Sequence, residues 1–368
     1  MPGEIELLEQ ELAQWLGAAG AVATGFGRGA LALALETIGV EQADVLAPDF
    51  ICAQVPAAVR WATGRPVPYP VERDLGVNPA PFRGAFTPKT KAAIVPHFFG
   101  RVQPRIEDLA AICHERGAAL VEDCALALGA RLGDRQAGTF GDAAVFSFTK
   151  SDWCYGGGAA VFYSAKWLEW ARNLRARRGR HGRRRALCYG LLRGADWEAN
   201  RPSRARLAEF TGRLAERCAA MLLPAFATGN FFDAGTMDAV LPRFAARRAR
   251  GILRHLAATQ AAQRGACQRL ATALASAPGA CRPFWARQEG ESAAFYLLWA
   301  EMGSASELRE RAAGHGRTLR LTWPAYEMPW TEPSPAVREL AGRLLFLEVH
   351  PRLSERETQR LVDGLQKV

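Results

Sequence analysis

The sequence predicts an α/β protein with a mostly parallel sheet in a large domain, followed by a small C-terminal α+β domain. Short apolar runs alternate with helical patterns over the first 165 residues, and this alternation is typical of a parallel sheet covered on both faces. The chain then becomes helical and rich in Arg and Ala before mixed patterns return. Because 368 residues allow two domains, we predict a large domain over 1–245 and a small one over 246–368.

Seven short apolar runs are the candidate strands of the large domain. They cover residues 21–24, 44–48, 65–69, 91–98, 118–123, 143–148 and 159–164. Helical patterns fill several of the gaps, at 30–39, 54–63 and 105–117. The order of these elements favours parallel pairing, because parallel strands need a helical crossover between them.

Residues 165–270 are predicted to be largely helical, and the last hundred residues to be mixed. Apolar residues recur at intervals of three and four in two segments, 207–223 and 240–274, and the segment 163–180 is also helix-like. In the small domain we expect a strand at 293–302 and helices at 304–316 and 353–368. The domain boundary therefore falls near a long connecting helix.

The net charge of +10 is unevenly distributed. Twelve arginines lie between Arg172 and Arg206, where Asp196 and Glu198 are the only acids, within a predicted helical segment at 165–215. We interpret this segment as a solvated arginine-rich surface. Weak contact with a membrane surface or with other anions is the alternative, and we predict no nucleic acid partner.

Composition also indicates where the protein is located and whether disulfides or a metal site are expected. No stretch approaches the roughly 18 apolar residues of a membrane span, and the N-terminus is acidic and amphipathic, unlike a secretory signal. We therefore expect a cytoplasmic protein. The eight cysteines contain no CxxC pair, so we predict neither a disulfide framework nor a metal site.

A glycine-rich turn at 25–35, GFGRGALALAL, joins the first predicted strand to a helix. Backbone N–H groups and the dipole at a helix N-terminus favour a bound phosphate. Gly25, Gly27 and Ala30 also fit a dinucleotide pattern, with Asp49 as the ribose-binding acid. An NAD-dependent or flavin oxidoreductase, or a turn without any ligand, therefore remains open.

Two adjacent acids, Glu122 and Asp123, end the fifth predicted strand. Open α/β sheets bind ligands at the carboxyl ends of their strands. Neighbouring strand residues point to opposite faces, so we expect one acid to face a site and the other to cap the next helix. That both acids are caps stays open.

Lys150 is one of only five lysines in a chain with 42 arginines. It lies with Ser147 just past the sixth predicted strand, before the glycines at 156–158. A lysine at a strand end can form a Schiff base when its surroundings lower its pKa. The other lysines lie in a polar stretch, on the arginine-rich helix and at the C-terminus: Lys89, Lys91, Lys166 and Lys367.

These motifs, in this order, resemble the DegT/DnrJ/EryC1/StrS family, the sugar aminotransferases of pyridoxal phosphate (PLP) fold type I. The motifs are GFGRGAL, LAPDFICAQV, IVPHFFGR, ALVEDCALALGARLGDRQAGTFGDAAVFSF, the lysine and GGG. The resemblance covers about residues 15–165 and is densest from 91 to 161. Its most specific part runs from EDCALALGA to GTFGDAAVFSF. We therefore expect the type I transferase fold.

The resemblance also implies the site. Lys150 would hold PLP as a Schiff base, and Asp123 would pair with the pyridinium nitrogen. Four residues would bind the cofactor's phosphate, with Arg28 where the family usually has threonine: Gly27, Arg28, Gly29 and Ser147. Cys52 falls where many members stack an aromatic ring on the cofactor. Lys150 and Asp123 are thus the predicted catalytic residues.

The implied activity is transamination from an amino acid donor, such as glutamate, to a keto sugar or cyclitol. A nucleotide-linked acceptor could place its phosphates against residues 172–206. The resemblance further implies a homodimer with active sites at the interface. Dehydration or decarboxylation with the same cofactor, a Rossmann-type NAD-dependent oxidoreductase and a non-catalytic protein of this fold are the alternatives.

Three departures from the family pattern affect these expectations. Lys150 follows Phe148 by two residues, where the family has four. Leu126 replaces a common glutamine or histidine. At 234–237 the chain reads AGTM, where the family has an Asn-x-Arg-Met segment that reaches the neighbouring subunit. The shorter turn before Lys150 raises the question of whether its amine reaches the cofactor.

Overall fold

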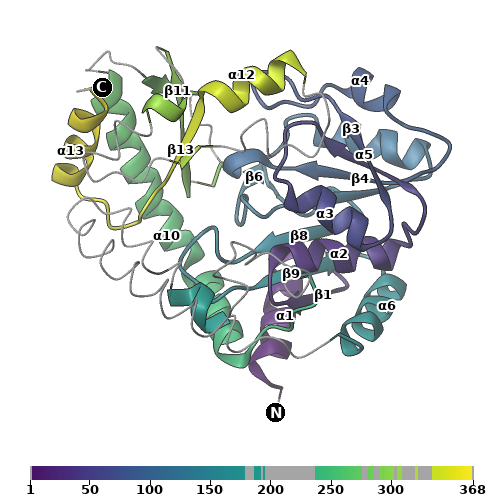
Figure 1. The fold of residues 1–368 in the computed structure, drawn as a ribbon. Helices are drawn as coiled ribbons and strands as arrows, with labels where there is room; N and C mark the ends of the chain where they lie inside the picture. Colours follow the sequence, from purple (N-terminus) through teal and green to yellow (C-terminus); the bar gives the residue numbers. More distant parts are fainter. Residues whose placement is uncertain are drawn as a thin grey trace.

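The computed structural model describes ten stretches of the chain: 2–178, 186–191, 194, 237–275, 281–285, 290–292, 294–301, 305–308, 320–321 and 334–366. Within them a large and a small sheet are joined by one long helix, α10 (Figure 1). The helix predicted at 207–223 and the AGTM segment up to residue 236 lie outside the described residues.

The large sheet has seven strands in the order β1-β9-β8-β5-β4-β2-β3. Their bounds are β1 Gly20–Thr24, β2 Asp44–Pro48, β3 Arg65–Tyr69, β4 Thr90–Pro96, β5 Ala119–Asp123, β8 Ala143–Ser147 and β9 Gly158–Phe162. β9 runs antiparallel to both of its neighbours, β1 and β8, and the other neighbouring pairs of this sheet are parallel. The prediction of a mostly parallel sheet is confirmed, and all seven predicted strands are present.

Both faces of this sheet are covered. All residues of β1, β2, β8 and β9 are buried, although successive side chains point to opposite faces. The surrounding helices (Figure 1) are α1 Glu4–Leu16, α2 Gly27–Ile38, α3 Gln54–Trp61, α4 Pro79–Gly84, α5 Ile106–Glu115 and α6 Ala165–Ala176. The short helix α4 and the hairpin of β6 (Arg131–Leu132) and β7 (Arg135–Gln136) were not predicted.

The small sheet is antiparallel, with the order β10-β11-β13-β12. Its strands are β10 Cys281–Pro283, β11 Phe295–Ala300, β12 Arg320–Leu321 and β13 Leu344–Glu348, accompanied by α12 Pro335–Arg343 and α13 Glu355–Gln366. The helix α10, Arg243–Ala275, belongs to both cores: residues up to Leu256 pack in the large one, and residues from Ala266 in the small one. The boundary after residue 245 stays a prediction.

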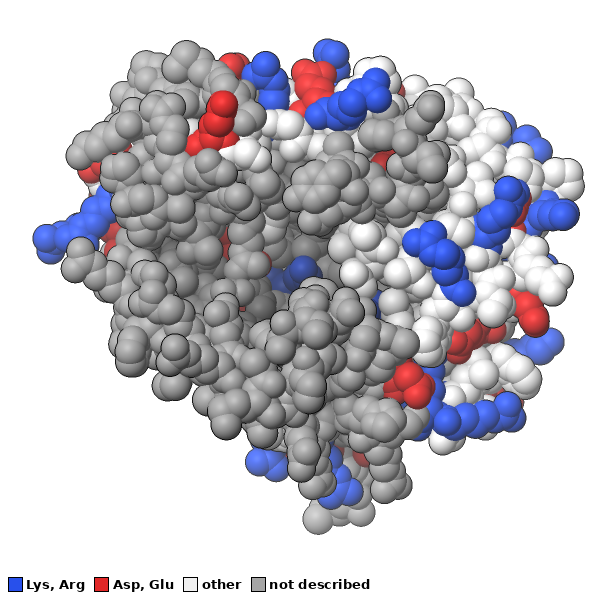
Figure 2. Space-filling view, viewed as in Figure 1, with Lys and Arg blue, Asp and Glu red and all other residues white. Residues whose placement is uncertain are grey.

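Part of the arginine-rich segment has a structural role. The guanidinium of Arg178 is buried, donates to the carbonyl oxygens of Gly29 and Met237 and pairs with Glu36. Arg175 pairs with the buried Glu9. On the face shown in Figure 2, the described Lys and Arg side chains are scattered among acidic and uncharged ones. No helix among the described residues has the length and apolarity to cross a membrane.

The carboxyl ends of three parallel strands meet at one edge of the sheet. Pro96 at the end of β4 lies opposite Asp123 at the end of β5, and Asp123 lies opposite Val145 near the end of β8. The predicted acid and Lys150 are therefore brought to the same edge by the parallel register. This edge is where ligands bind in open α/β sheets.

The glycines at 156–158 pack directly on the glycine-rich turn before α2. The Gly157 N–H donates to the Gly25 carbonyl oxygen at 2.6 Å. A Cβ on Gly158 would lie 2.5 Å from the Gly27 nitrogen, and Gly156 and Gly157 have φ values of 103° and 109°. These glycines thus provide close backbone contact as well as a turn.

Replacing Gly158 by alanine is expected to destabilise the fold by about 1–3 kcal/mol, because the added methyl group has no space. The matched control is Gly251→Ala in α10, where nothing lies within 4 Å of the new Cβ and about 0.5–1 kcal/mol of stabilisation is expected. Urea unfolding followed by circular dichroism measures both. Equal stabilities of the two variants would contradict the packing described here.

Candidate active site

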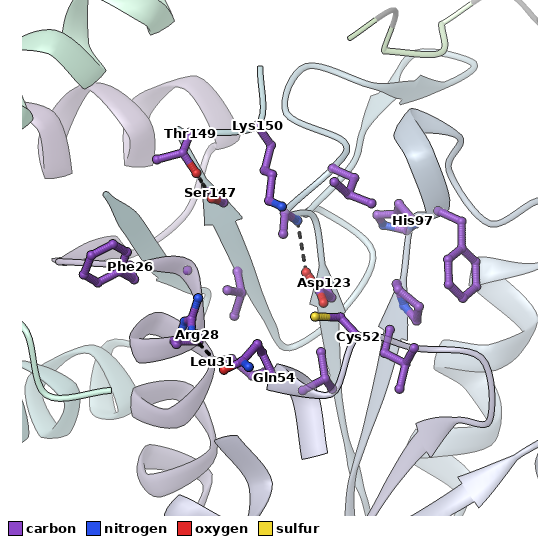
Figure 3. Close-up of a pocket in the computed structure, with 18 of the residues that line it drawn as sticks. Phe26, Arg28, Leu31, Cys52, Gln54, His97, Asp123, Ser147, Thr149 and Lys150 are labelled. Carbon is purple, nitrogen blue, oxygen red and sulfur yellow. Dashed lines mark hydrogen bonds between the residues drawn. The ribbon is translucent and has the colours of Figure 1, made fainter. Parts of the chain in front are cut away.

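A cavity of about 180 Å³ lies at this edge of the large sheet (Figure 3). Its walls come from the start of α2, from residues 51–55, from the ends of β4, β5 and β8, and from one residue of the segment 186–191. The lining residues are Phe26, Gly27, Arg28, Leu31, Ile51, Cys52, Gln54, Val55, Pro96, His97, Phe98, Asp123, Ala125, Leu126, Val145, Ser147, Thr149, Lys150 and Tyr189.

One end of the cavity suits an anion. The helix α2 begins at Gly27, with no side-chain cap from Phe26, so the first N–H groups have no partner within the helix and add to its positive dipole end. Ser147 and Thr149 bring two hydroxyl groups, 3.1 Å apart, to the same end. A Cβ on Gly27 would lie 3.1 Å from that of Ser147. The glycine therefore keeps this end open.

Arg28 adds a permanent positive charge to this wall. Its Nη1 donates to Oε1 of Gln54 at 2.7 Å, and its guanidinium lies 5.9 Å from the centre of the Phe26 ring. Gly29 is buried and is not among the described lining residues; its carbonyl accepts from Arg178 at 3.1 Å. The predicted phosphate-binding residues Gly27, Arg28 and Ser147 thus line the cavity together, whereas the predicted Gly29 does not line it.

Asp123 faces the cavity (Figure 3). Among the described residues its carboxylate accepts one hydrogen bond, from the Ala125 N–H at 3.0 Å. Burial raises the pKa of Asp123 above its ordinary value, and the Ala125 N–H, His97 and Lys150 oppose this shift. The carboxylate therefore has spare acceptor capacity in surroundings that favour a positively charged partner.

Glu122 points away from the cavity, as the strand alternation predicted, but it does not cap a helix. Its Oε1 accepts from the N–H groups of Phe140 and Gly141, and its Oε2 accepts from the Gly138 N–H and from His97 Nε2 at 2.8 Å. The side chain is fully buried. Glu122 therefore holds the loop 138–141 against the sheet.

Replacing Glu122 by glutamine is expected to reduce the free energy of unfolding by about 3–5 kcal/mol, since an amide group would face backbone N–H donors. The control Glu115→Gln removes an exposed carboxylate paired with Arg83 and should leave the free energy of unfolding close to that of the wild type, because exposed ion pairs contribute little. Chemical denaturation provides the comparison. A Glu122→Gln protein as stable as the control would show that this network is dispensable.

Lys150 reaches the cavity despite the short spacing from Phe148. Residues 148–151 form a turn directly after β8, and the lysine side chain extends from this turn toward Asp123 (Figure 3). The positive charge of Lys150 acts to lower the pKa of Asp123, against the larger effect of burial. Lys89, Lys91 and Lys166 are exposed and line no part of this cavity, and Lys367 lies outside the described residues.

Cys52 and Leu126 line the wall near Asp123. The Cys52 sulfur points into the cavity (Figure 3), and its side chain is partly exposed. Cys52 is smaller than the aromatic ring that the family resemblance suggested at its position. Leu126 is less polar than the amide or imidazole suggested at its own. This part of the wall is therefore less polar than the family pattern implies.

The sequence did not single out four of the polar cavity residues, His97, Thr149, Gln54 and Tyr189. His97 follows β4, and its position in the IVPHFFG motif could have indicated it; Thr149 lies between two predicted site residues. Gln54 and Tyr189 carried no signal, because each is placed by contacts between distant segments. His97, Glu122 and Cys124 lie within 4.8 Å of one another, but the carboxylate and imidazole are already hydrogen-bonded, which argues against a metal ion there.

The dinucleotide alternative is not supported by the geometry. Asp49, the candidate ribose-binding acid, is buried and accepts from the Val71 N–H at 2.9 Å. It is not among the described lining residues. The strand order, with the antiparallel β9 next to the edge strand β1, also differs from the order 3-2-1-4-5-6 of a dinucleotide-binding sheet.

Comparison with known proteins identifies similar chains. The model of the DegT/DnrJ/EryC1/StrS aminotransferase family matches residues 3–227. A dTDP-3-amino-3,4,6-trideoxy-alpha-D-glucose transaminase from Micromonospora megalomicea subsp. nigra is 38% identical over 161 residues, 43% of each chain. An L-glutamine:2-deoxy-scyllo-inosose aminotransferase from Micromonospora echinospora is 36% identical over 159 residues, 42% of this chain and 38% of the relative. The matched stretch thus spans less than half of either curated relative.

Solved structures match over nearly the whole chain. The structure of DesV from S. venezuelae has a TM-score of 0.74 and 22% identity, and the match covers 100% of this chain and 89% of that one. The 3-amino-5-hydroxybenzoic acid synthase structure has a TM-score of 0.73 and 21% identity, over 99% and 90% of the two chains. This likeness confirms the predicted fold.

Proposed function

Because the chain belongs to the DegT/DnrJ/EryC1/StrS aminotransferase family, we propose that it is a biosynthetic PLP-dependent aminotransferase acting on a keto sugar or cyclitol. The observation that carries the proposal is the cavity itself: an amine and a carboxylate face each other beside an anion-binding helix end. The named relatives act on a dTDP-linked sugar and on a cyclitol ketone, which supports this substrate class. Glutamate or glutamine is the proposed amino donor.

The lining residues fit the cofactor. PLP, when bound, supplies an aldehyde that exchanges between amines and a ring that accepts electrons. Asp123, with one hydrogen bond from described residues and a raised pKa, suits a protonated ring nitrogen. The start of α2 with Ser147 and Thr149 suits a phosphate, and Arg28 adds charge for it. The apolar wall formed by Cys52 and Leu126 suits contact with a flat ring.

Each residue then has a physical task. Lys150 Nζ would hold the cofactor covalently and, once displaced by the donor amine, carry the proton that transamination moves between two carbons. Asp123 would keep a proton on the ring nitrogen through its negative charge. Ser147, Thr149 and the α2 N–H groups would fix the phosphate, and the apolar wall would exclude water.

The assembly and the location belong to the same proposal. A homodimer that shares its active sites and a cytoplasmic location fit the family, and a second subunit could complete the acceptor side of the cavity. Phosphates of a nucleotide-linked acceptor could contact the arginine-rich segment. Of its described arginines, Arg175 and Arg178 are already paired with acids, so other residues of the segment would serve this purpose.

A half-reaction tests the proposed activity without knowledge of the acceptor. The purified chain is loaded with PLP, and its visible absorbance is followed after addition of L-glutamate or L-glutamine. We expect the absorbance of the PLP form to convert to that of the pyridoxamine phosphate form. Bound PLP that is unchanged by both donors, together with turnover of an amino acid by decarboxylation, would contradict transamination.

A further inference from the structure

Tyr189 reaches the cavity from a distant part of the chain. It lies in the helical segment 186–191, whereas every other described lining residue lies between positions 26 and 150. Its ring packs edge to face on Phe26, with 5.3 Å between the ring centres and an interplanar angle of 83°. Because Phe26 directly precedes the start of α2, Tyr189 covers the anion-binding end of the cavity.

The segment that carries Tyr189 is fixed by the residues after Lys150. Trp153 Nε1 donates to the Gly190 carbonyl oxygen at 2.6 Å. A Cβ on Gly190 would lie 2.2 Å from Cδ1 of Tyr155, so the backbone rests directly on that ring. The side chains of Ala186 and Cys188 are buried beneath the segment. The position of Tyr189 is therefore set by its own contact with Phe26 and by the contacts of its neighbour Gly190 with Trp153 and Tyr155.

Trp153 is itself held by the long helix. Arg248 of α10 donates to the Trp153 carbonyl oxygen and pairs with Asp152, both at 2.8 Å. Its guanidinium lies 5.6 Å from the centre of the Trp153 ring. A series of contacts thus connects α10 with the turn after Lys150, and that turn with the segment that carries Tyr189. Rigid support of this kind is what a ligand-contacting side chain needs.

The same segment presents a different face to solvent. Leu187 is 47% exposed and Leu191 is 52% exposed, although both are apolar and lie within two residues of Tyr189. Tyr189 therefore faces the cavity, whereas Leu187 and Leu191 face solvent and are not among its described lining residues. This difference provides a control for any test of Tyr189.

We propose that Tyr189 is a further cofactor-binding residue, which with Phe26 closes the cavity over the phosphate-bearing end of the bound group. The inference rests on the proposed function, because it takes the ligand to be a phosphorylated pyridine. Ring packing against Phe26 excludes water from the phosphate end and strengthens the charge interactions there.

Binding of pyridoxamine phosphate tests the inference, because this form is held without a covalent bond to Lys150. Calorimetry on the full chain gives its Kd for the wild type, Tyr189→Ala, Tyr189→Phe and Leu187→Ala. We expect Tyr189→Ala to weaken binding about tenfold, the effect of losing an aromatic pair and its shielding. Tyr189→Phe, which keeps the ring, and Leu187→Ala, which leaves the cavity intact, should stay within about twofold of the wild type.

The outcomes separate this inference from the proposed function. A wild-type chain that binds neither PLP nor pyridoxamine phosphate would contradict the function itself. A wild type that binds while Tyr189→Ala binds equally well, or is weakened only as much as Leu187→Ala, would overturn the role of Tyr189 alone. If Tyr189→Ala does not fold, Tyr189→Leu serves the same test, with an expected loss of about threefold because it keeps apolar contact but no ring.

Discussion

Replacing Lys150 by alanine is expected to lower the rate of transamination by about 10⁴-fold, the upper range for a residue that transfers a proton. The variant should also lack the absorbance of covalently held PLP. Both effects follow from the position of Lys150, whose amine lines the cavity while the other described lysines do not. Visible spectroscopy and a glutamate-dependent assay measure them.

Two further lysine variants control this experiment. Lys150→Arg keeps a positive charge near Asp123 but cannot bind an aldehyde in the same way, so we expect it to be as inactive as the alanine variant. Lys166→Ala changes an exposed lysine on α6 and should retain the wild-type rate. An active Lys150→Ala protein, or an inactive Lys166→Ala protein, would contradict the assignment of the chemistry to Lys150.

Asp123→Asn is expected to lower the rate of transamination by about 10²- to 10³-fold, a typical loss when one electrostatic stabiliser is removed. The amide keeps the shape of the side chain but cannot hold a proton on the ring nitrogen by charge. Because burial already raises the pKa of Asp123, a positively charged ring nitrogen would compensate the buried carboxylate, and asparagine would lose this mutual stabilisation. Single-turnover absorbance measurements with L-glutamate give the rate.

The matched control for Asp123 is Asp108→Asn, an exposed residue of α5 that pairs with Arg105. It should leave both the rate and cofactor binding unchanged. Asp123→Asn should still bind PLP through Lys150 and the phosphate end of the cavity. A variant with wild-type rate would exclude Asp123 as the partner of the ring nitrogen.

Most of the large sheet could be predicted from the sequence, because a strand buried on both faces gives a continuous apolar run. For this reason β2 begins and ends where the pattern at 44–48 does. The bounds of β3 also match the pattern at 65–69, although this edge strand is only partly buried. The helix α4 and the hairpin of β6 and β7 are too short to show periodicity. The segment 207–223 lies outside the described residues, so its predicted helix stays a prediction.

The candidate site was predictable where strand geometry determines it. Alternation along β5 separates Glu122 from Asp123, and parallel register brings the strand ends together. The loop whose N–H groups donate to the Glu122 carboxylate lies 16–19 residues further along the chain. Local sequence patterns do not reveal such a contact. Tyr189 depends in the same way on Trp153 and Phe26.

The spacing between Phe148 and Lys150 is the point at which the sequence departs most from the family pattern. In the structure the turn at 148–151 compensates for it, since the lysine lines the same cavity as Ser147 and Asp123. Phe148 itself is buried, and its N–H donates to the Gly157 carbonyl oxygen at 3.1 Å. The shortened connection is thus anchored on the glycine turn.

Borohydride reduction of the PLP-loaded protein, followed by mass spectrometry of its peptides, tests whether Lys150 holds the cofactor covalently. This assignment predicts one reduced PLP adduct, on the peptide that contains Lys150, and no adduct in the Lys150→Ala variant. An adduct on Lys166 or on another lysine, or a wild-type protein that stays unmodified after incubation with PLP and borohydride, would contradict it.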